Sequence, residues 1–462
     1  MKKMKINKYV MLFAAATALI VTSCTTEDLD PTLAQSKSVE GSVTRVDNLY
    51  SILKGAHNTL TGAGYYGRDM IATNEVRSDN TFSNGNSGRF TTQSQFQYNS
   101  NTGFVWDNVY TLLADVNIII NTDLSTLEGD LDYGAHIQGQ AMILRALGHF
   151  DLLRTYGQQH AGGGSLGVPI VTTFKGEDLF PSRNSIDEVK QAIYSDLETA
   201  FGMMDSSYDT SKIFVSKYVA KALEARVAVY FGDWDRAVSA SEAVINSGLY
   251  SVIGADAFVS SWTTEGGTNV MFELAFSTAD NRGPDALGYI YRYPADAPGG
   301  YGDIQVLPEV LDIYDAGDVR LDIFGYQDGG TALRNIGKYP DTANGADNIP
   351  LFRYEEVILN YAEALLETDG DAVTQLNLIA NNRNATPYTS VTKDDILNER
   401  RRELIFEGFR FDDMMRTGQS ATAVGSVGNV ISTLSYPNNL FAWPIPLSEM
   451  NANSNMVQND GY

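Results

Sequence analysis

The feature that most constrains the fold is the stretch at residues 216–248, SKYVAKALEARVAVYFGDWDRAVSASEAVINSG. Apolar residues recur at steps of three and four over 219–230 and again over 237–245, which places them on one face of each of two amphipathic helices. Gly232 interrupts the pattern, and Gly248 is suited to end the second helix as a C-terminal cap. The stretch therefore predicts a helical hairpin.

A single hairpin cannot bury its own apolar face, so it needs similar neighbours. Small residues on both helices allow close approach, as in tetratricopeptide hairpins, which repeat about every 34 residues. The same helical spacing occurs in other segments of the chain: 45–53, 104–121, 138–156, 185–201, 355–367, 371–383 and 393–415. We therefore predict a mainly α fold, a tetratricopeptide-like scaffold of stacked hairpins that forms an α–α superhelix.

Helical spacing is lost in two long stretches, 62–103 and 251–350, which are rich in Gly, Ser, Asn, Asp, Thr and Tyr; only 307–314 has it within the second. Irregular excursions held by a rigid frame commonly carry binding residues. We predict one domain over 41–462, with short strands and loops in these two ligand-side excursions. The helical scaffold is expected at about 41–61, 104–250 and 351–420.

The N-terminus indicates export and anchoring. Residues 1–23 combine a lysine-rich head with an apolar run too short to span a membrane, which predicts a signal peptide. The run ends in Val21-Thr22-Ser23-Cys24, which resembles the bacterial lipobox, in which the cysteine is lipidated. We expect Cys24 to carry the lipid, residues 24–40 to form a tether, and the protein to sit on the cell outer membrane.

Cys24 is the only cysteine, so the chain has no internal disulfide and a structural zinc site built on cysteines is disfavoured. The acidic residues Glu27, Asp28 and Asp30 resemble the surface-export signal of Bacteroidetes lipoproteins. An acidic linker is the competing interpretation.

Several function classes have no support. A net charge of −24 argues against nucleic acid, because phosphate binding depends on Lys and Arg. The G-x-S-x-G match at 163–167 lacks the strand and helix that such a nucleophile needs, and the four histidines lack zinc-hydrolase spacing. No pair among the 57 acidic residues stands out as a glycosidase pair. We expect a binding protein with no catalytic residues, metal or cofactor.

Five ordered segments carry a family resemblance: QGQAMILRALGHFDLLRTYG at 138–157, RNSIDEVKQAIYSDL at 183–197, RYEEVILNYAEALL at 353–366, ERRRELIFEGFRFDDMMRTG at 399–418 and PIPLSEMNANSNMVQNDGY at 444–462. They are similar to the signatures of the SusD/RagB family of outer-membrane lipoproteins. The resemblance implies a protein that binds a glycan at the cell surface and sits as a lid over a SusC-like TonB-dependent transporter. A RagB-like branch that handles peptides, or a scaffold subunit without its own ligand, are the alternatives.

The charged residues of the fourth segment also have a structural interpretation. Opposite charges recur at three- and four-residue steps, a ladder that can pair with neighbouring helices. Its members are Arg400, Arg401, Glu403, Glu407, Arg410, Asp412 and Arg416. We expect framework here rather than a binding site.

Because the excursions match no family pattern, we choose candidate binding residues by the chemistry of their side chains. Sugar rings stack on aromatic faces, and their hydroxyls pair with polar side chains. Tyr289, Tyr291 and Tyr293 alternate along a predicted strand and form either a sugar platform or a core-facing row. Trp262, in a predicted loop, is the favoured single stacker. The first excursion adds Asp79, Asn80, Phe82, Arg89 and Phe90 as candidates.

Overall fold

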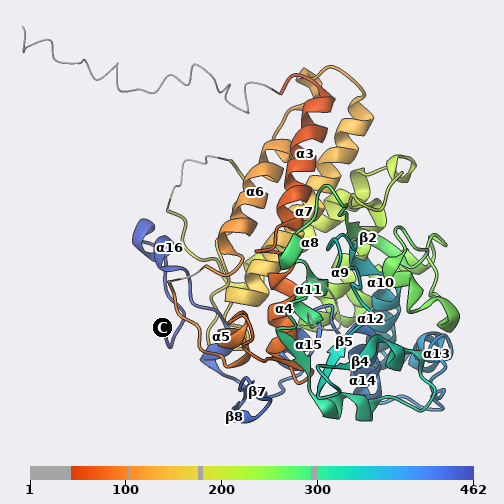
Figure 1. Cartoon of the computed structure of the whole chain (residues 1–462). Coiled ribbons are helices and arrows are strands. Elements are labelled where there is room, and N and C mark those ends of the chain that lie inside the picture. The colour runs from red at the N-terminus through yellow and green to blue at the C-terminus, as the bar shows by residue number, and fades with distance from the viewer. Residues whose placement is uncertain (1–42, 102, 175–179, 293–299) are drawn as a thin grey trace, which may run out of the picture. The chain divides into compact units, whose positions relative to one another are not determined.

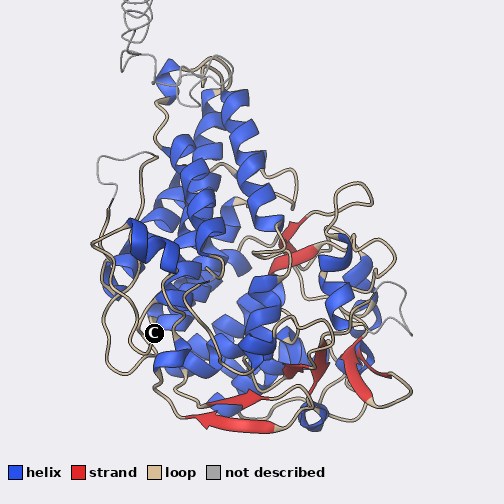
Figure 2. Ribbon diagram, turned by 60° about the vertical axis from the view of Figure 1, so that its left-hand side comes forward, coloured by secondary structure: helices blue, strands red, loops and turns tan. Residues whose placement is uncertain are grey.

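The computed structural model describes residues 43–101, 103–174, 180–292 and 300–462. Residues Arg45–Tyr462 form one compact unit, whereas the predicted signal peptide and Cys24 lie outside the described residues. Helices dominate and the strands are short, which confirms the predicted mainly α fold (Figure 1, Figure 2). Within the described ranges, no helix combines the length and the apolar character needed to cross a lipid bilayer.

The scaffold consists of α3 (Val46–Thr61), α6 (Trp106–Ile120), α7 (Leu131–Tyr156), α8 (Ile186–Met203), α9 (Lys217–Phe231), α10 (Trp234–Ile245), α12 (Tyr354–Glu367), α13 (Ala372–Asn381), α14 (Lys393–Leu404) and α15 (Arg410–Arg416). Helices α3, α6 and α7 lie side by side (Figure 1). Helix α7 is buried around most of its circumference, as its mostly apolar sequence leads one to expect.

The predicted hairpin is formed by α9 and α10. Gly232 caps α9 in the left-handed region, at φ 74°, where a glycine carries no steric penalty. The turn is closed by a hydrogen bond from the Asp233 amide to the Ala228 carbonyl at 2.8 Å. Ala228, Ala237 and Ala364 are fully buried together, so the small residues bring the hairpin close to α12.

Over the described residues, the strands form four two-stranded antiparallel sheets. The pairs are β1 (Thr81–Ser83) with β3 (Ile304–Val306), β2 (Val270–Leu274) with β6 (Ile349–Arg353), β4 (Phe324–Gln327) with β5 (Ala332–Asn335), and β7 (Ala421–Val424) with β8 (Val430–Leu434). The β2–β6 pair joins the beginning of the second excursion to its end, directly before α12. The second excursion is therefore closed against the scaffold.

Three local predictions are wrong. The first excursion contains helices α4 (Asp69–Val76) and α5 (Thr91–Ser94); α4 is buried from Met70 onward and so shows no amphipathic spacing. The helix predicted at 393–415 is two helices, because Phe406 and Gly408 have φ of 71° and 82° and break it. The segment predicted helical at 307–314 is a 3₁₀ helix over Pro308–Ile313.

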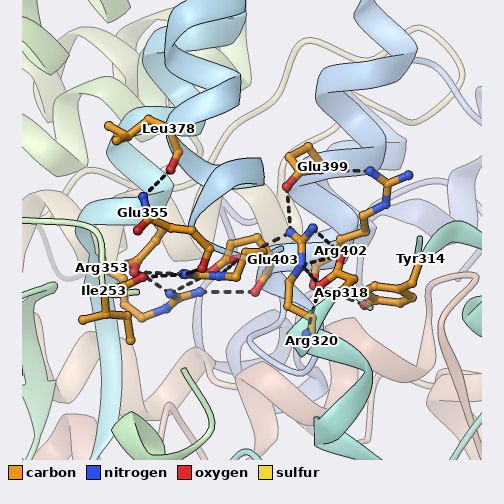
Figure 3. A network of polar contacts seen from close by, with 12 residues as sticks. Ile253, Tyr314, Asp318, Arg320, Arg353, Glu355, Leu378, Glu399, Arg402 and Glu403 are labelled. Carbon is orange, nitrogen blue, oxygen red and sulfur yellow. Dashed lines mark hydrogen bonds and ion pairs between the residues drawn. The ribbon is translucent and has the colours of Figure 1, made fainter. Parts of the chain in front are cut away.

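A buried ion-pair network ties the second excursion to the scaffold (Figure 3). Arg320 from the excursion pairs with Asp318 at 2.7 Å and with Glu399 of α14 at 2.7 Å. Arg353, at the end of β6, and Arg383, after α13, both bind Glu403. All of these side chains are at most 3% exposed. Because every charge has partners, the network holds three chain segments in fixed positions.

The charge ladder of 399–418 pairs with other elements throughout. Arg400 binds Asp413 and the Asn360 side chain, Arg416 binds Glu363 of α12, and Asp412 binds Arg154 of α7. These side chains are largely buried, which fits the framework role expected from the sequence.

Candidate functional site

The two excursions meet at the β1–β3 pair. Thr81 lies opposite Val306, and Ser83 lies opposite Ile304. The pairing continues past the strands, since the Asn84 amide donates to the Asp303 carbonyl at 2.9 Å. Residues 84–89, which follow β1, therefore lie beside residues 301–303, which precede β3.

Asp303 fixes the loop that follows β1. Its side chain is fully buried and accepts hydrogen bonds from the Ser87 amide at 2.9 Å and from the Ser87 hydroxyl at 2.7 Å. The side-chain amide of Asn86 donates to the Tyr301 carbonyl at 2.7 Å. Gly85, at φ 73°, makes the tight turn possible. The Ser/Asn/Gly sequence thus forms an ordered loop.

Arg89 and Tyr301 form the aromatic and cationic part of this surface. The Arg89 guanidinium carbon lies 4.5 Å from the centroid of the half-buried Tyr301 ring. Arg89 also donates to the Ser87 hydroxyl at 2.9 Å and to Asp285 at 3.3 Å. The Arg89 side chain remains 32% exposed, so its donors and the ring beside it are open to a ligand.

Asp285 links the cluster to the start of α4. Its side chain is 44% exposed and accepts a short hydrogen bond from Arg68, which also donates to Asp69 at 2.6 Å. Burial raises the pKa of Asp69, and the Arg68 guanidinium opposes that shift. Arg68 and Arg89 thus face three carboxylates, those of Asp69, Asp285 and Asp303.

A small pocket of about 10 Å³ borders this cluster at Gly67 and Ala286, the sequence neighbours of Arg68 and Asp285. Gly67, Arg282, Ala286, Asp341 and Asp347 are among its lining residues. Burial raises the pKa of Asp347 to about 6, and the nearby Asp341 carboxylate adds to the shift. The pocket adds polar, partly desolvated groups to the region where the excursions meet.

The prediction for Trp262 is wrong. This residue lies in a 3₁₀ helix over Ser260–Thr263, and its side chain is 6% exposed. The Lys338 ammonium lies 4.5 Å from the ring centroid, and the Tyr339 ring packs against it edge-on at 5.5 Å. A ring enclosed in this way has no face for a sugar.

The tyrosine platform is also wrong. Tyr289 and Tyr291 lie on the short helix α11 (Leu287–Tyr291), where residues two apart point to different sides. Tyr289 is 8% exposed, and Tyr291 is fully buried against Phe406. Tyr293 lies outside the described residues. For Tyr289 and Tyr291, the structure agrees with the alternative interpretation, in which the rings face the core.

The remaining candidates from the first excursion are mostly structural. Asn80 is fully buried and accepts from Arg401 at 2.7 Å, while Phe82 and Phe90 are 5% and 6% exposed. Asp79 is paired with Arg410 at 2.7 Å; burial opposes ionisation, but Arg410 and Arg401 still lower the pKa of Asp79. Arg89 stays in a position to contact a ligand.

Sequence reasoning missed Arg68, Asp285, Tyr301 and Asp303. Tyr301 and Asp303 lie 212 and 214 positions from Arg89 in the sequence, and the β1–β3 pairing brings them to it. No local spacing signals this contact. Within the described residues, no group of three or more His, Cys, Asp or Glu side chains is arranged to hold a metal ion.

Two family models match the chain. Residues 29–229 match the model described as "Starch-binding associating with outer membrane", and residues 322–462 match the model of the SusD family. The starch-binding protein SusD of Bacteroides thetaiotaomicron is 38% identical over 131 residues, which are 27% of this chain and 22% of that protein.

Solved structures are similar over almost the whole chain. A SusD superfamily protein from Bacteroides vulgatus is 27% identical, with a TM-score of 0.81 over 91% of this chain and 99% of that one. Surface glycan-binding protein A from Bacteroides fluxus is 23% identical, with a TM-score of 0.74 over 91% of this chain and 100% of that one. The second likeness shows the fold alone.

Proposed function

Because the chain belongs to the SusD family, we propose that it is a cell-surface lipoprotein that binds oligo- or polysaccharide and delivers it to a SusC-like TonB-dependent transporter. Members of this family are non-catalytic binding proteins associated with the outer membrane. The family membership agrees with the expectation that the chain is not an enzyme. The ligand class, the transporter and the lipid anchor at Cys24 are the parts that we propose.

The observation that carries the proposal is the surface made by Arg89, Tyr301, Asp285 and Asn86 where the excursions meet. A flat ring can stack on the C–H face of a sugar, and the surrounding amide, carboxylate and guanidinium groups can pair with its hydroxyls. Hydrogen bonds within the protein hold these groups in place, so binding orders few side chains.

The charge of this surface favours a neutral glycan. Arg68 and Arg89 are each engaged by carboxylates, and the three acidic side chains outnumber the two guanidinium groups. The chain as a whole carries a charge of −24. An anionic glycan would meet net repulsion here, whereas a neutral one would not.

Affinity electrophoresis tests the proposal. The soluble form that begins after Cys24 is run through gels containing neutral polysaccharides such as starch, mannan, xylan and fructan. At least one should retard it, and Tyr301→Ala should abolish the retardation because the stacking ring is lost. Tyr208→Ala is the matched control, since Tyr208 is also half-buried but lies on the scaffold before α9.

The alternatives predict different results. A RagB-like protein would bind casein-derived peptides and none of the polysaccharides. A scaffold subunit would bind neither, yet would still co-purify with the transporter from detergent extracts of the outer membrane. Cys24→Ser in the full-length chain should release the protein from the membrane fraction; retention there would contradict the lipid anchor.

A further inference from the structure

Tryptophan is the side chain best suited to stacking on sugars, and the chain has four. Trp106, Trp262 and Trp443 are at most 6% exposed and belong to the core. Trp234, at the start of α10, is half-buried and packs against the buried cluster of Ala228, Val229, Ala237 and Ala364. Trp234 is therefore the tryptophan that has exposed ring surface.

Trp234 lies in an open groove of about 490 Å³, a size within the range of ligand-binding clefts. The groove is formed by the turn between α9 and α10, the start of α14 and the end of α15, elements that can be followed in Figure 1. The lining residues that matter here are Phe231, Trp234, Lys393, Asp394, Arg416 and Gln419. None of them belongs to the Arg89 and Tyr301 surface.

A buried carboxylate holds the charged groups of the groove in place. Glu363 of α12 has a fully buried side chain that binds Lys393 at 2.8 Å and Arg416 at 2.5 Å. Lys393 also binds Glu367 at 2.6 Å, and its ammonium lies 4.4 Å from the Trp234 ring centroid. The lysine is thus fixed at the edge of the groove while its side chain stays 31% exposed.

Polar groups of the groove match sugar hydroxyls. Asp394 is exposed and offers acceptors. The half-buried Gln419 side-chain amide donates to the Thr417 hydroxyl at 3.0 Å and accepts from Arg410 at 3.3 Å, which leaves its second N–H for a ligand. Three cations, Lys393, Arg400 and Arg416, face four carboxylates, those of Glu363, Glu367, Asp394 and Asp413. The groove therefore has no net positive charge to attract an anionic ligand.

We propose that this groove is a second glycan-binding site that takes a segment of a neutral oligosaccharide, with Trp234 and Phe231 as the aromatic surface and Asp394 and Gln419 as hydroxyl partners. The inference rests on the proposed function, because both sites would hold the same class of ligand. Two sites on one chain can engage one polysaccharide at two points, which raises the affinity without any new contact.

Isothermal titration tests the second site by stoichiometry. The soluble form that begins after Cys24 is titrated with neutral gluco-, manno-, xylo- and fructo-oligosaccharides. The parent should bind two copies of one of them. The double variant Asp394→Ala with Gln419→Ala, and the double variant Arg89→Ala with Tyr301→Ala, should each bind one copy, and the combination of the two should bind none.

The matched control is Asp235→Ala, an exposed carboxylate on α10 that does not line the groove. It should leave the stoichiometry unchanged. On immobilised polysaccharide, loss of either site should weaken binding by at least about tenfold. Acrylamide quenching gives a readout specific to the groove, because Trp234 is the tryptophan that is not buried, and bound oligosaccharide should protect it.

The outcomes separate the two proposals. If the parent binds one copy and only the Arg89 and Tyr301 changes remove it, the second site is refuted and the proposed function stands. If no oligosaccharide binds the parent, the proposed function fails and the second site fails with it. If casein-derived peptides, and not oligosaccharides, protect Trp234, the groove is not a glycan site.

Discussion

Glu403 provides a sharp test of how the second excursion is held on the scaffold. One carboxylate oxygen of Glu403 accepts from Arg353 at 3.1 Å and from Arg383 at 2.9 Å. The other accepts from Arg383 at 2.8 Å and from Arg320 at 3.4 Å. The change Glu403→Gln keeps the shape of this side chain and removes its charge.

The structure sets the size of the effect. Whichever way the introduced side-chain amide is oriented, its NH₂ group faces two guanidinium N–H groups, so two hydrogen bonds are replaced by repulsion between donors. Breaking one partner out of a buried ionic network costs about 3–5 kcal/mol, because the remaining charges are left uncompensated. Since Arg320 belongs to the second excursion and Arg353 lies directly after it, at the end of β6, the change should also loosen the loops at the candidate site and weaken glycan binding.

Urea unfolding followed by circular dichroism measures the loss, with Glu128→Gln as the control. Glu128 also pairs with an arginine, Arg45 at 2.8 Å, but its side chain is 77% exposed, so its removal should cost below about 1 kcal/mol. If Glu403→Gln costs no more than Glu128→Gln, the network does not stabilise the fold as argued.

The pH dependence of this loss has a defined sign. Burial opposes ionisation of Glu403, but Arg383 and Arg353 outweigh it and lower its pKa below the ordinary value. The parent therefore keeps this stabilisation above about pH 4.3, the pKa of an unperturbed glutamate, and loses it as the pH falls further through the folded-state pKa. The difference between parent and variant should shrink in acid.

Three further predictions concern the site and its surroundings. Asp303→Ala removes both carboxylate oxygens that accept from Ser87, so it should disorder the loop at 84–89. Glycan binding in affinity electrophoresis should weaken by about tenfold or more, a loss of at least about 1.4 kcal/mol; unchanged mobility shifts would contradict the role given to this loop. Gly345→Ala places a Cβ 2.9 Å from the Cβ of Ala286, at φ 66°, so urea unfolding should show a loss of stability of about 1–3 kcal/mol. The control Gly330→Ala, at φ 88° with no atom within 4 Å of the new Cβ, should lose less. Equal losses would rule out the contact with Ala286 as the cause. Burial raises the pKa of Glu75 to about 7, so the folded chain keeps a proton there that the unfolded chain loses near pH 4.3, and the free energy of unfolding should fall as the pH rises from about 5 to 7. Over that range Glu75→Gln should gain about 2 kcal/mol of stability relative to the parent. A constant difference between the two would contradict the raised pKa.

The scaffold was predictable because its helices are amphipathic and local. Helix α10 follows from the spacing at 237–245, where burial on one side, at Ala237, Ala240, Ser241 and Val244, leaves a periodic trace in the sequence. Helix α4 left no such trace, because Met70–Val76 are buried on every side. Total burial removes the alternation between apolar and polar residues that sequence reasoning depends on.

The errors at the candidate site have a common physical cause. Trp262 is enclosed by Lys338, Tyr339 and Arg353, all of which lie more than 70 positions away in the sequence. Tyr289 and Tyr291 follow Gly288, in a segment too short to distinguish a strand from a helical turn by spacing. Contacts with residues far away in the sequence decide whether a large aromatic side chain is exposed. The residue type alone therefore could not show whether these aromatic residues bind a ligand or belong to the core.

Arg89 illustrates why one candidate kept its accessibility. It follows a loop whose polar side chains bond one another and the backbone of 301–303, so the guanidinium lies over the Tyr301 ring and stays 32% exposed while it contacts Asp285 and Asp303. Arg320, Arg353 and Arg383 are paired with buried carboxylates and contribute stability instead. The family signature at 399–418 covers Glu399, Glu403 and Glu407, three of the carboxylates of that network, and so describes the frame. A frame fixed by mutually satisfied buried charges cannot change one residue without leaving a charge unpaired, whereas the loops it carries can change freely. The identity of the ligand therefore depends on the loops and on grooves such as that of Trp234, which the family signatures do not describe.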